Sequence, residues 1–418
     1  MGERRDDLPA RTLQANRAQL RLVPLDLEGM LSEEHPARAV WAYVERLDLE
    51  AFYAVIRSRE GSAGRPAVDP QIYLALWIYA TLEGVGSARE IERLTRDHLA
   101  YQWICGGVAV NYHSLSDFRN VAADRLKDLL AQSVALLMAS GLVEIRRVSQ
   151  DGMKVRASAG ASSFRTRGKL EKIAQQQVER LESEIDEEAA PANRREKSAR
   201  ERAEKERAER IERALEEMKE AEKRKRSNNG KKKTEARVST TDPESRVMKM
   251  ADGGFRPAFN VHLATDTDAS VILAADVNNE GTDLHAMLPL AEQIEEQHQR
   301  RPGEWLADGG CSSVENVNQM AERGCNLIAP LRQRPTEGRK PTDVRPGDSP
   351  AVREWRARMA TDEAKQLYKR RGATAEWVNA QFRAQGMLRF LVRGTKKVLS
   401  VVLLHALTHN MRRTWALT

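Results

Sequence analysis

The feature that most limits the fold of this chain is a long charged segment from Gly168 to Lys233, composed mainly of Glu, Lys, Arg, Ala and Gln. It has too few apolar residues to fill a core of its own, but those it has recur at helical spacing. They form two narrow stripes, one of Leu170, Ile173, Val178, Leu181 and Ile185, and one of Ala203, Ala208, Ile211, Leu215 and Met218. The pattern predicts a coiled-coil hairpin of two antiparallel helices that turns at Pro191. Such a hairpin is either a solvated structural element or an arm that contacts DNA or a second subunit.

The end of this segment is strongly basic. Lys223–Arg226 are consecutive cations, and Lys231, Lys232 and Lys233 follow after a short polar stretch. Charge runs are often only solvated, but a cluster of this density is also typical of segments that neutralise phosphates. The whole chain has 68 Lys+Arg against 61 Asp+Glu, a net charge of +7. The excess is modest but concentrated in patches, which indicates a polyanionic partner such as double-stranded DNA.

The part of the chain at residues 31–140 has helical periodicity and predicts an all-α N-terminal domain, preceded by a flexible arm at residues 1–30. Its helices are expected at 32–59, from Pro70 behind the N-cap Asp69, at 88–98, and from Ser114 through Leu130. The last two could form a helix-turn-helix that presents cations such as Arg119 to DNA. An ordinary helical bundle explains the same pattern equally well.

Strand patterns alternate with helices in the rest of the chain. Residues 141–167 contain a buried strand around Asp151, and residues 234–418 continue the layer after the insertion. The expected elements are strands at 259–265 and 270–277, a helix at 284–298, a strand at 305–308, a helix at 313–323, a strand at 326–329 and helices from 351 onward. This order predicts an α/β fold, with a mixed sheet that starts antiparallel, continues parallel and is flanked by helices.

Three acids stand out in this layer: Asp151 on the first strand, Asp308 at the end of a later strand, and Glu376 on a helix. Gly152 follows Asp151 at once, so that the backbone can be approached closely there. Taken alone, an Asp near a strand is more often a turn or cap residue. In an open α/β layer, however, residues at the ends of neighbouring strands meet in one crevice.

Carboxylates that meet in one crevice repel one another, and burying them uncompensated is costly. Hard divalent cations such as Mg²⁺ or Mn²⁺ relieve this repulsion. Two such ions can clamp the attacking and leaving oxygens of a phosphodiester. We therefore expect Asp151, Asp308 and Glu376 to be both the catalytic residues and the metal ligands.

The helix around Glu376 carries cations at helical spacing. Glu376, Asn379 and Arg383 are expected on one face, and Tyr368 and Arg371 on a neighbouring one. Cations beside a metal-binding acid suit phosphate contacts, although an exposed, salt-bridged helix has the same spacing. Lys154 and Arg156, which follow Asp151, are further candidates for contacts with DNA phosphates.

These motifs together resemble the DDE transposases of bacterial insertion sequences, in the IS-four/IS-five-like superfamily and most closely its IS-eleven-eighty-two-type branch. The similar segments are Gly64-Arg-Pro with Asp69-Pro70, Asp151-Gly-Met-Lys-Val-Arg156, Thr241-Asp-Pro-Glu-Ser-Arg246, Ala307-Asp-Gly-Gly310, Tyr368-x2-Arg371-x4-Glu376-x6-Arg383 and the tail from Gly386 to Arg413. The resemblance implies an RNase-H-like catalytic domain with the triad Asp151, Asp308 and Glu376. It also implies cleavage and rejoining of DNA at terminal inverted repeats, by a homodimer or a higher oligomer on DNA.

The chain departs from the family pattern at three places. Gly310 and Cys311 replace the usual Ala and Tyr after Asp308, Arg383 replaces a Lys, and Val401 stands where an acid is common. None of these changes removes a triad acid. Two other functions fit the same residues: a catalytically decayed DNA-binding or repressor protein, and a nuclease that hydrolyses DNA without joining it.

The remaining sequence features indicate a cytoplasmic, nucleoid-associated protein. The Cys residues, Cys105, Cys311 and Cys325, are few and far apart, which argues against a disulfide framework and for a reducing compartment. No signal peptide and no apolar run long enough to span a bilayer is visible, so no membrane partner is expected.

Overall fold

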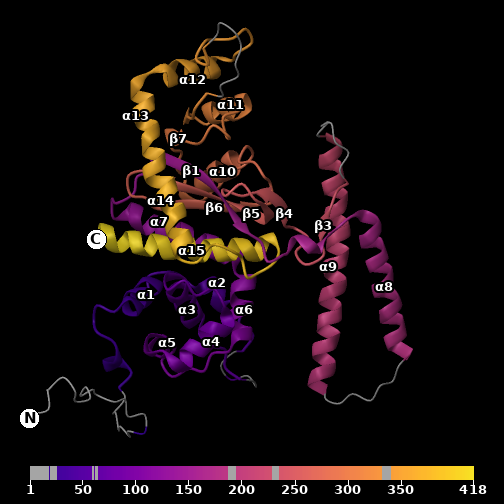
Figure 1. The fold of residues 1–418 in the computed structure, drawn as a ribbon. Helices are drawn as coiled ribbons and strands as arrows, with labels where there is room; N and C mark the ends of the chain where they lie inside the picture. Colours follow the sequence, from indigo (N-terminus) through magenta and orange to yellow (C-terminus); the bar gives the residue numbers. More distant parts are fainter. Residues whose placement is uncertain are drawn as a thin grey trace, which may run out of the picture.

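The computed structural model describes residues 18, 26–58, 61, 65–186, 194–227, 235–331 and 340–418. Within these residues, a mixed sheet lies between two groups of helices, and a long helical hairpin stands to one side (Figure 1). The C-terminal helix α15 (Thr395–Leu417) runs between the sheet and the N-terminal helices and contacts both. Among the described residues, none of the helices has the length and apolar character needed to cross a membrane.

The N-terminal part is all-helical over its described residues. Its helices are α1 (Pro36–Val44), α2 (Glu50–Tyr53), α3 (Pro70–Leu82), α4 (Ala88–Asp97), α5 (Leu99–Cys105) and α6 (Tyr112–Val121). Helix α3 begins as predicted, with Asp69 accepting a hydrogen bond from the Gln71 N–H at 2.8 Å. It is buried along most of its length, which confirms that it is central to this core.

Two helix predictions in this part are wrong. The helix expected over 32–59 is broken, because Asp48 accepts a hydrogen bond from the Glu50 N–H at 2.8 Å and starts the separate helix α2. The helix expected from Ser114 begins earlier, since the Asn111 side chain caps α6 by accepting from the Ser114 N–H at 2.9 Å. Helix α6 then ends before Ala122, and α7 (Ala123–Ala139) starts as a new helix.

The sheet has the predicted mixture of directions. Its strands are β1 (Arg147–Arg156), β4 (Arg246–Lys249), β5 (Phe255–Asp266), β6 (Ile272–Asn278), β7 (Glu304–Leu306) and β8 (Asn326–Ile328). Strand β1 pairs antiparallel with β5 and parallel with β7, while β6 is antiparallel to β5 and β8 is parallel to β7. The antiparallel start and parallel continuation are therefore confirmed. Strand β4 and the small pair β2 (Phe164–Arg165) and β3 (Val238–Ser239) were not predicted.

Alternation along β1 divides the sheet into two faces. Met153 and Val155 belong to a core shared with α15, α14 (Trp377–Ala384) and the N-terminal helices. Val148 belongs to a second core, with Trp305 and the helices α10 (Met287–His298), α11 (Val314–Glu322) and α12 (Pro350–Ala360). Helices thus cover both faces of the central strand.

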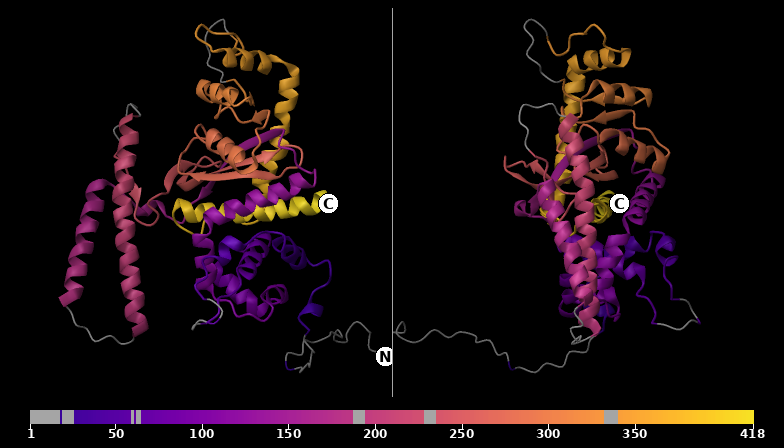
Figure 2. Two further views of the ribbon diagram at one scale, coloured as in Figure 1. Left: turned by 180° about the vertical axis from the view of Figure 1, so that it is seen from behind. Right: turned by 90° about the vertical axis from the view of Figure 1, so that its right-hand side faces the viewer.

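The charged insertion forms two antiparallel helices, α8 (Arg167–Asp186) and α9 (Arg194–Ser227), as predicted. Arg167 pairs with Glu222 at 2.7 Å and Arg180 with Glu204 at 3.2 Å, so the helices run in opposite directions. Figure 2 shows the hairpin beside the rest of the molecule in the left view and in front of it in the right view. The turn expected at Pro191, the cations Lys231, Lys232 and Lys233, and most of the arm at residues 1–30 lie outside the described residues.

Candidate active site

Asp151 lies in the middle of β1, and its side chain points to the face that carries Met153 and Val155. Its two carboxylate oxygens have different partners. Arg371 Nη2 donates to Oδ1 at 2.7 Å, and Asn379 Nδ2 donates to Oδ2 at 2.7 Å. Arg371 and Asn379 lie on the helices at Asp362–Arg371 and Trp377–Ala384, so C-terminal helices pack against β1 at Asp151.

Asp308 follows β7 and lies beside Asp151. In the parallel pairing of β1 with β7, Ser149 lies opposite Leu306. Asp151 and Asp308 follow two residues later in their own segments. The Asp308 carboxylate closes a tight turn, because Oδ1 accepts from the Gly310 N–H at 2.8 Å and from the Cys311 N–H at 3.2 Å. A Cβ at residue 310 would lie 2.9 Å from that oxygen, so the Asp308 carboxylate packs closely over Gly310.

Glu376 is placed by an unusual helical turn. Helix α13 (Asp362–Arg371) passes into a π turn at Gly372–Glu376 before α14 begins. A π turn closes over one more residue than an α turn, and such turns are common at functional sites. It brings residues five apart onto one side, so Arg371 Nη1 lies 3.7 Å from Glu376 Oε1. The Glu376 side chain is 67% exposed.

Arg371 therefore joins the predicted acids. Its side chain is 12% exposed, contacts Asp151 and Glu376, and interacts electrostatically with Asp308. Burial alone would lower the pKa of Arg371, but the carboxylates together with Tyr368 outweigh burial, and the pKa is raised. Burial raises the pKa of Asp151, the Arg371 charge opposes this, and the nearby Asp308 and Asp283 add to the rise.

Arg371 links the three acids. In the described part of the chain, no group of three His, Cys, Asp or Glu side chains is already arranged to hold a metal ion. Carboxylate oxygens are nevertheless the ligands that Mg²⁺ and Mn²⁺ prefer. The guanidinium supplies positive charge at the point these acids share.

The other predicted residues lie at various distances from this point. Tyr368 is half-buried beside Arg371, and burial raises its pKa. Lys154 and Arg156 alternate with Met153 and Val155, so they lie on the opposite face of β1 from Asp151. Arg383 is exposed on α14. Glu376, Asn379 and Arg383 were predicted to share one helix face, but of the three only Asn379 is buried. The hydrogen bond from Asn379 to Asp151 was not predicted.

The structure does not support Arg119 as a DNA contact. Its guanidinium lies over the Trp77 ring at 4.4 Å, and Nη1 donates to the Gly86 carbonyl at 3.0 Å. The side chain is buried, and burial lowers its pKa to about 10. It therefore holds α6 against α3, and only 6% of the residue is exposed.

The cations on α4 are also engaged within the protein. Arg93 pairs with Glu90 at 2.6 Å and with Asp97 at 2.8 Å, and Arg96 pairs with Glu92 at 2.6 Å. Exposed pairs of this kind contribute little free energy, so these cations can exchange their partners for phosphates. The structure thus leaves both the helix-turn-helix and the plain-bundle interpretation standing.

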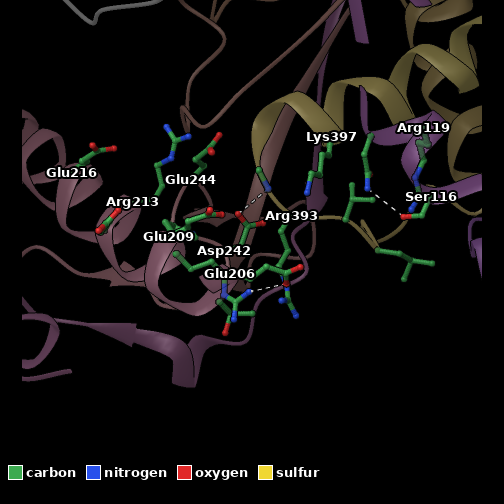
Figure 3. A pocket seen from close by; sticks show the side chains of 18 residues that line it. Ser116, Arg119, Glu206, Glu209, Arg213, Glu216, Asp242, Glu244, Arg393 and Lys397 are labelled. Carbon is green, nitrogen blue, oxygen red and sulfur yellow. Dashed lines mark hydrogen bonds and ion pairs between the residues drawn. The ribbon is translucent and has the colours of Figure 1, made fainter. Parts of the chain in front are cut away.

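A cleft of about 930 Å³ lies between the hairpin, α6 and the start of α15, away from the acids just described (Figure 3). Cations and acids line it together, among them Arg213, Arg393, Lys397 and Glu209. Two acids at its wall bind the start of α15: Asp242 accepts from the Gly394 N–H at 3.1 Å, and Glu244 from the Thr395 N–H at 2.8 Å. Because cations and acids are mixed there and two of the acids bind the start of α15, we interpret the cleft as the place where the hairpin, α6 and α15 meet.

The fold and the site define a mixed α/β protein with acids gathered at the central strand of its sheet. Comparison with protein families adds two matches: residues 25–121 match the family described as a transposase domain, and residues 313–415 match the transposase DDE domain. The second match includes Glu376, Arg371 and the tail, and both matches support a DDE transposase that acts on DNA. Neither the curated proteins nor the solved structures include a match to this chain.

Proposed function

We propose that this protein is a DNA transposase of an insertion sequence, of the IS-eleven-eighty-two type. In this proposal it binds the terminal inverted repeats of its element and catalyses metal-dependent cleavage and strand transfer. Asp151, Asp308 and Glu376 are the acids of the reaction. The partners are double-stranded DNA and further copies of the same chain, in the bacterial cytoplasm.

The observation that carries the proposal is the position of Arg371. One guanidinium contacts Asp151 at 2.7 Å and Glu376 at 3.7 Å, and also interacts with Asp308, although the three acids are far apart in the sequence. Salt bridges that serve stability alone rarely gather several acids around one buried cation, because desolvation costs as much as the pairing returns. Asp151 is a largely buried acid whose pKa is raised by burial, which is more typical of functional sites.

The sheet supports the fold that this function needs. Three antiparallel strands, β6, β5 and β1, are followed by the parallel strands β7 and β8. We assign this arrangement to an RNase-H-like domain, with the hairpin α8–α9 as an insertion after its first strand. Parallel pairing of β1 with β7 is what brings Asp151 and Asp308 side by side.

The chemistry of the donors fits a hard divalent cation, Mg²⁺ or Mn²⁺. Asp151 and Asp308 would hold it, with Glu376 approaching from the π turn. When bound, such an ion polarises a phosphodiester and stabilises the charge that develops on its oxygens. The chain itself then has two tasks: Asn379 holds the Asp151 carboxylate in place, and Arg371, once released from the acids, is free to pair with a phosphate.

The contacts with DNA phosphates are proposals of the same kind. Lys154, Arg156, Tyr368, Arg371 and Arg383 lie on or near β1 and the C-terminal helices, and Lys231, Lys232 and Lys233 belong to the basic segment after α9. Phosphate contacts set the position of DNA without reading its sequence.

The test is the variant Asp151→Asn, which keeps the shape of the side chain and removes its charge. We expect cleavage of repeat-end DNA in Mg²⁺ to fall by roughly a thousandfold or more, which corresponds to the several kcal/mol that metal assistance supplies. Binding of the same DNA should change little, because it rests on cations elsewhere. Cleavage that persists in this variant contradicts the assignment. Joined products in the wild type separate a transposase from a nuclease, and their absence together with intact binding indicates a decayed copy.

A further inference from the structure

The loop between β6 and α10 carries a further acid, Asp283, whose carboxylate lies against Gly152. A Cβ added at Gly152 would come within 2.4 Å of Asp283 Oδ1 and 2.7 Å of its Cγ. No side chain fits at residue 152, because the Asp283 carboxylate fills its place. The close approach predicted at Gly152 is therefore observed, and Asp283 is the group that approaches.

The Asp283 side chain is anchored to the strand next to β1. Asn260 Nδ2 donates to Asp283 Oδ1 at 2.6 Å, and the fully buried His262 has its Nδ1 3.8 Å from the same oxygen. Both residues are on β5, where His262 pairs with Gly152 in the antiparallel register. The carboxylate is thus held over the backbone that carries Asp151.

The main chain of the same loop contacts the turn that carries Asp308. Cys311 Sγ donates to the Asp283 carbonyl at 3.5 Å. Asn316 Nδ2 donates to the Leu284 carbonyl at 2.9 Å and to the Cys311 carbonyl at 2.7 Å. The Cys311 N–H closes the turn of Asp308. The side chain of Asp283 therefore contacts the segment that carries Asp151, and its main chain contacts the segment that carries Asp308.

We propose that Asp283 is a positioning residue that sets the separation of Asp151 and Asp308. The inference rests on the proposed function, in which these two acids bind one cation. The contact with Gly152 works through shape, since the carboxylate fills the space beside a backbone without a side chain. Residues that orient metal ligands typically change metal affinity by about 10–100-fold when they are altered.

The experiment is a double-mutant cycle on the full chain, read out as Mn²⁺ affinity by titration. We expect Gly152→Ala and Asp283→Ala each to weaken Mn²⁺ binding by about tenfold or more. The double variant should bind Mn²⁺ about tenfold more tightly than Gly152→Ala alone, because the new methyl group enters the space that Asp283 leaves. Asp283→Asn keeps the shape and should stay within about threefold of the wild type. Asp276→Asn, a change of the same kind on β6, is the matched control and should have no effect.

Three results overturn the inference. Purely additive effects in the cycle mean that Asp283 does not act through Gly152, and an Asp283→Asn variant as weak as Asp283→Ala means that charge, not shape, matters. If Gly152→Ala does not fold, as judged by thermal unfolding, the comparison of Asp283→Ala with Asp283→Asn decides alone. Asp151→Asn in the same titration separates the two proposals. If Asp151→Asn leaves the Mn²⁺ affinity unchanged, the proposed function is contradicted. If Asp151→Asn weakens Mn²⁺ binding but Asp283→Ala does not, only this inference is contradicted.

Discussion

Arg371 Nη2 donates a hydrogen bond to Asp151 Oδ1 at 2.7 Å, joining the last residue of α13 to the middle of β1. Both side chains are largely buried, with 12% and 17% exposure. The guanidinium is therefore a resident counter-ion of the acids. A divalent ion at the same carboxylate would lie next to this positive charge, so the two cations compete.

The variant Arg371→Gln should bind Mn²⁺ more tightly than the wild type. A single charge and a divalent ion about 4 Å apart repel by roughly 8 kcal/mol at an effective dielectric constant of about 20. We expect Arg371 to avoid most of this repulsion by turning away, so that its replacement raises the Mn²⁺ affinity by only about tenfold, measured by Mn²⁺ titration. Cleavage should still fall, because the glutamine cannot form an ion pair with a phosphate.

Arg370→Gln is the matched control for that variant, since Arg370 is a neighbouring cation that pairs with the exposed Asp268 at 3.1 Å. Its Mn²⁺ affinity should equal that of the wild type. Weaker Mn²⁺ binding in Arg371→Gln would mean that Arg371 helps to hold the metal ligands in place, and the counter-ion interpretation would be wrong.

Asp242, in the wall of the cleft of Figure 3, should make stability depend on pH. Burial raises its pKa from 3.8 to about 6. The folded state thus binds this proton more tightly than the unfolded chain does. The contribution to stability is fully present below the unfolded pKa and is lost as pH rises through the folded one.

Asp242→Asn removes this titration and should therefore stabilise the protein at pH 8, by up to about 3 kcal/mol. At pH 3 and below, where this carboxyl is protonated in both the folded and the unfolded chain, the variant and the wild type should unfold alike. The measurement is thermal or denaturant unfolding of both proteins at each pH, compared as a difference so that other titrating groups cancel. A gain that is equal at both pH values would assign the effect to something other than this carboxyl.

Asn410 should be one of the most sensitive positions for stability. Its side chain on α15 pairs with the backbone of β6: Nδ2 donates to the Ile272 carbonyl at 2.9 Å, and Oδ1 accepts from the Ile272 N–H at 2.8 Å. Asn410→Leu leaves two buried backbone groups unpaired, at about 1–3 kcal/mol each. We expect the free energy of unfolding to fall by about 2–5 kcal/mol. A decrease below about 1 kcal/mol would show that water or a shift of α15 replaces these bonds.

Neutralising Lys231, Lys232 and Lys233 together tests the basic segment. If these cations bind phosphates, DNA affinity falls and its dependence on salt flattens, by roughly 0.9 in the logarithmic slope for each phosphate that the variant no longer neutralises. Equilibrium binding of repeat-end DNA at several salt concentrations measures both quantities. An unchanged slope would show that this run of charge is only solvated.

Much of the scaffold follows from local sequence patterns. The narrow stripes at helical spacing predicted the two helices α8 and α9, and alternating apolar residues predicted the pairing of β5 with β6. These patterns are strong because each segment must bury one face. The sequence also predicted that strand ends meet in one crevice, but it did not predict that β1 pairs with β7 and so places Asp308 beside Asp151.

The contacts that complete the site are non-local and could not be predicted in this way. Nothing in Gly372–Glu376 signals a π turn, because the extra residue is stabilised by packing on β1 and β5 rather than by its own composition. Asp283 has the sequence context of an ordinary loop acid, and Asn379 that of a helix surface. Gly152 was the one local signal, and it could indicate a close approach but not which residue approaches.

The central claim is that Asp151, Asp308 and Glu376 act together on one scissile phosphate. The most direct measurement is single-turnover cleavage of repeat-end DNA by Asp151→Asn, Asp308→Asn and Glu376→Gln, with DNA binding measured in parallel and Glu363→Gln on α13 as the control. We predict that cleavage falls by roughly a thousandfold in each of the three variants while DNA affinity is kept, and that the control cleaves normally. Cleavage at the wild-type rate by any one of the three would remove that acid from the site and contradict the account.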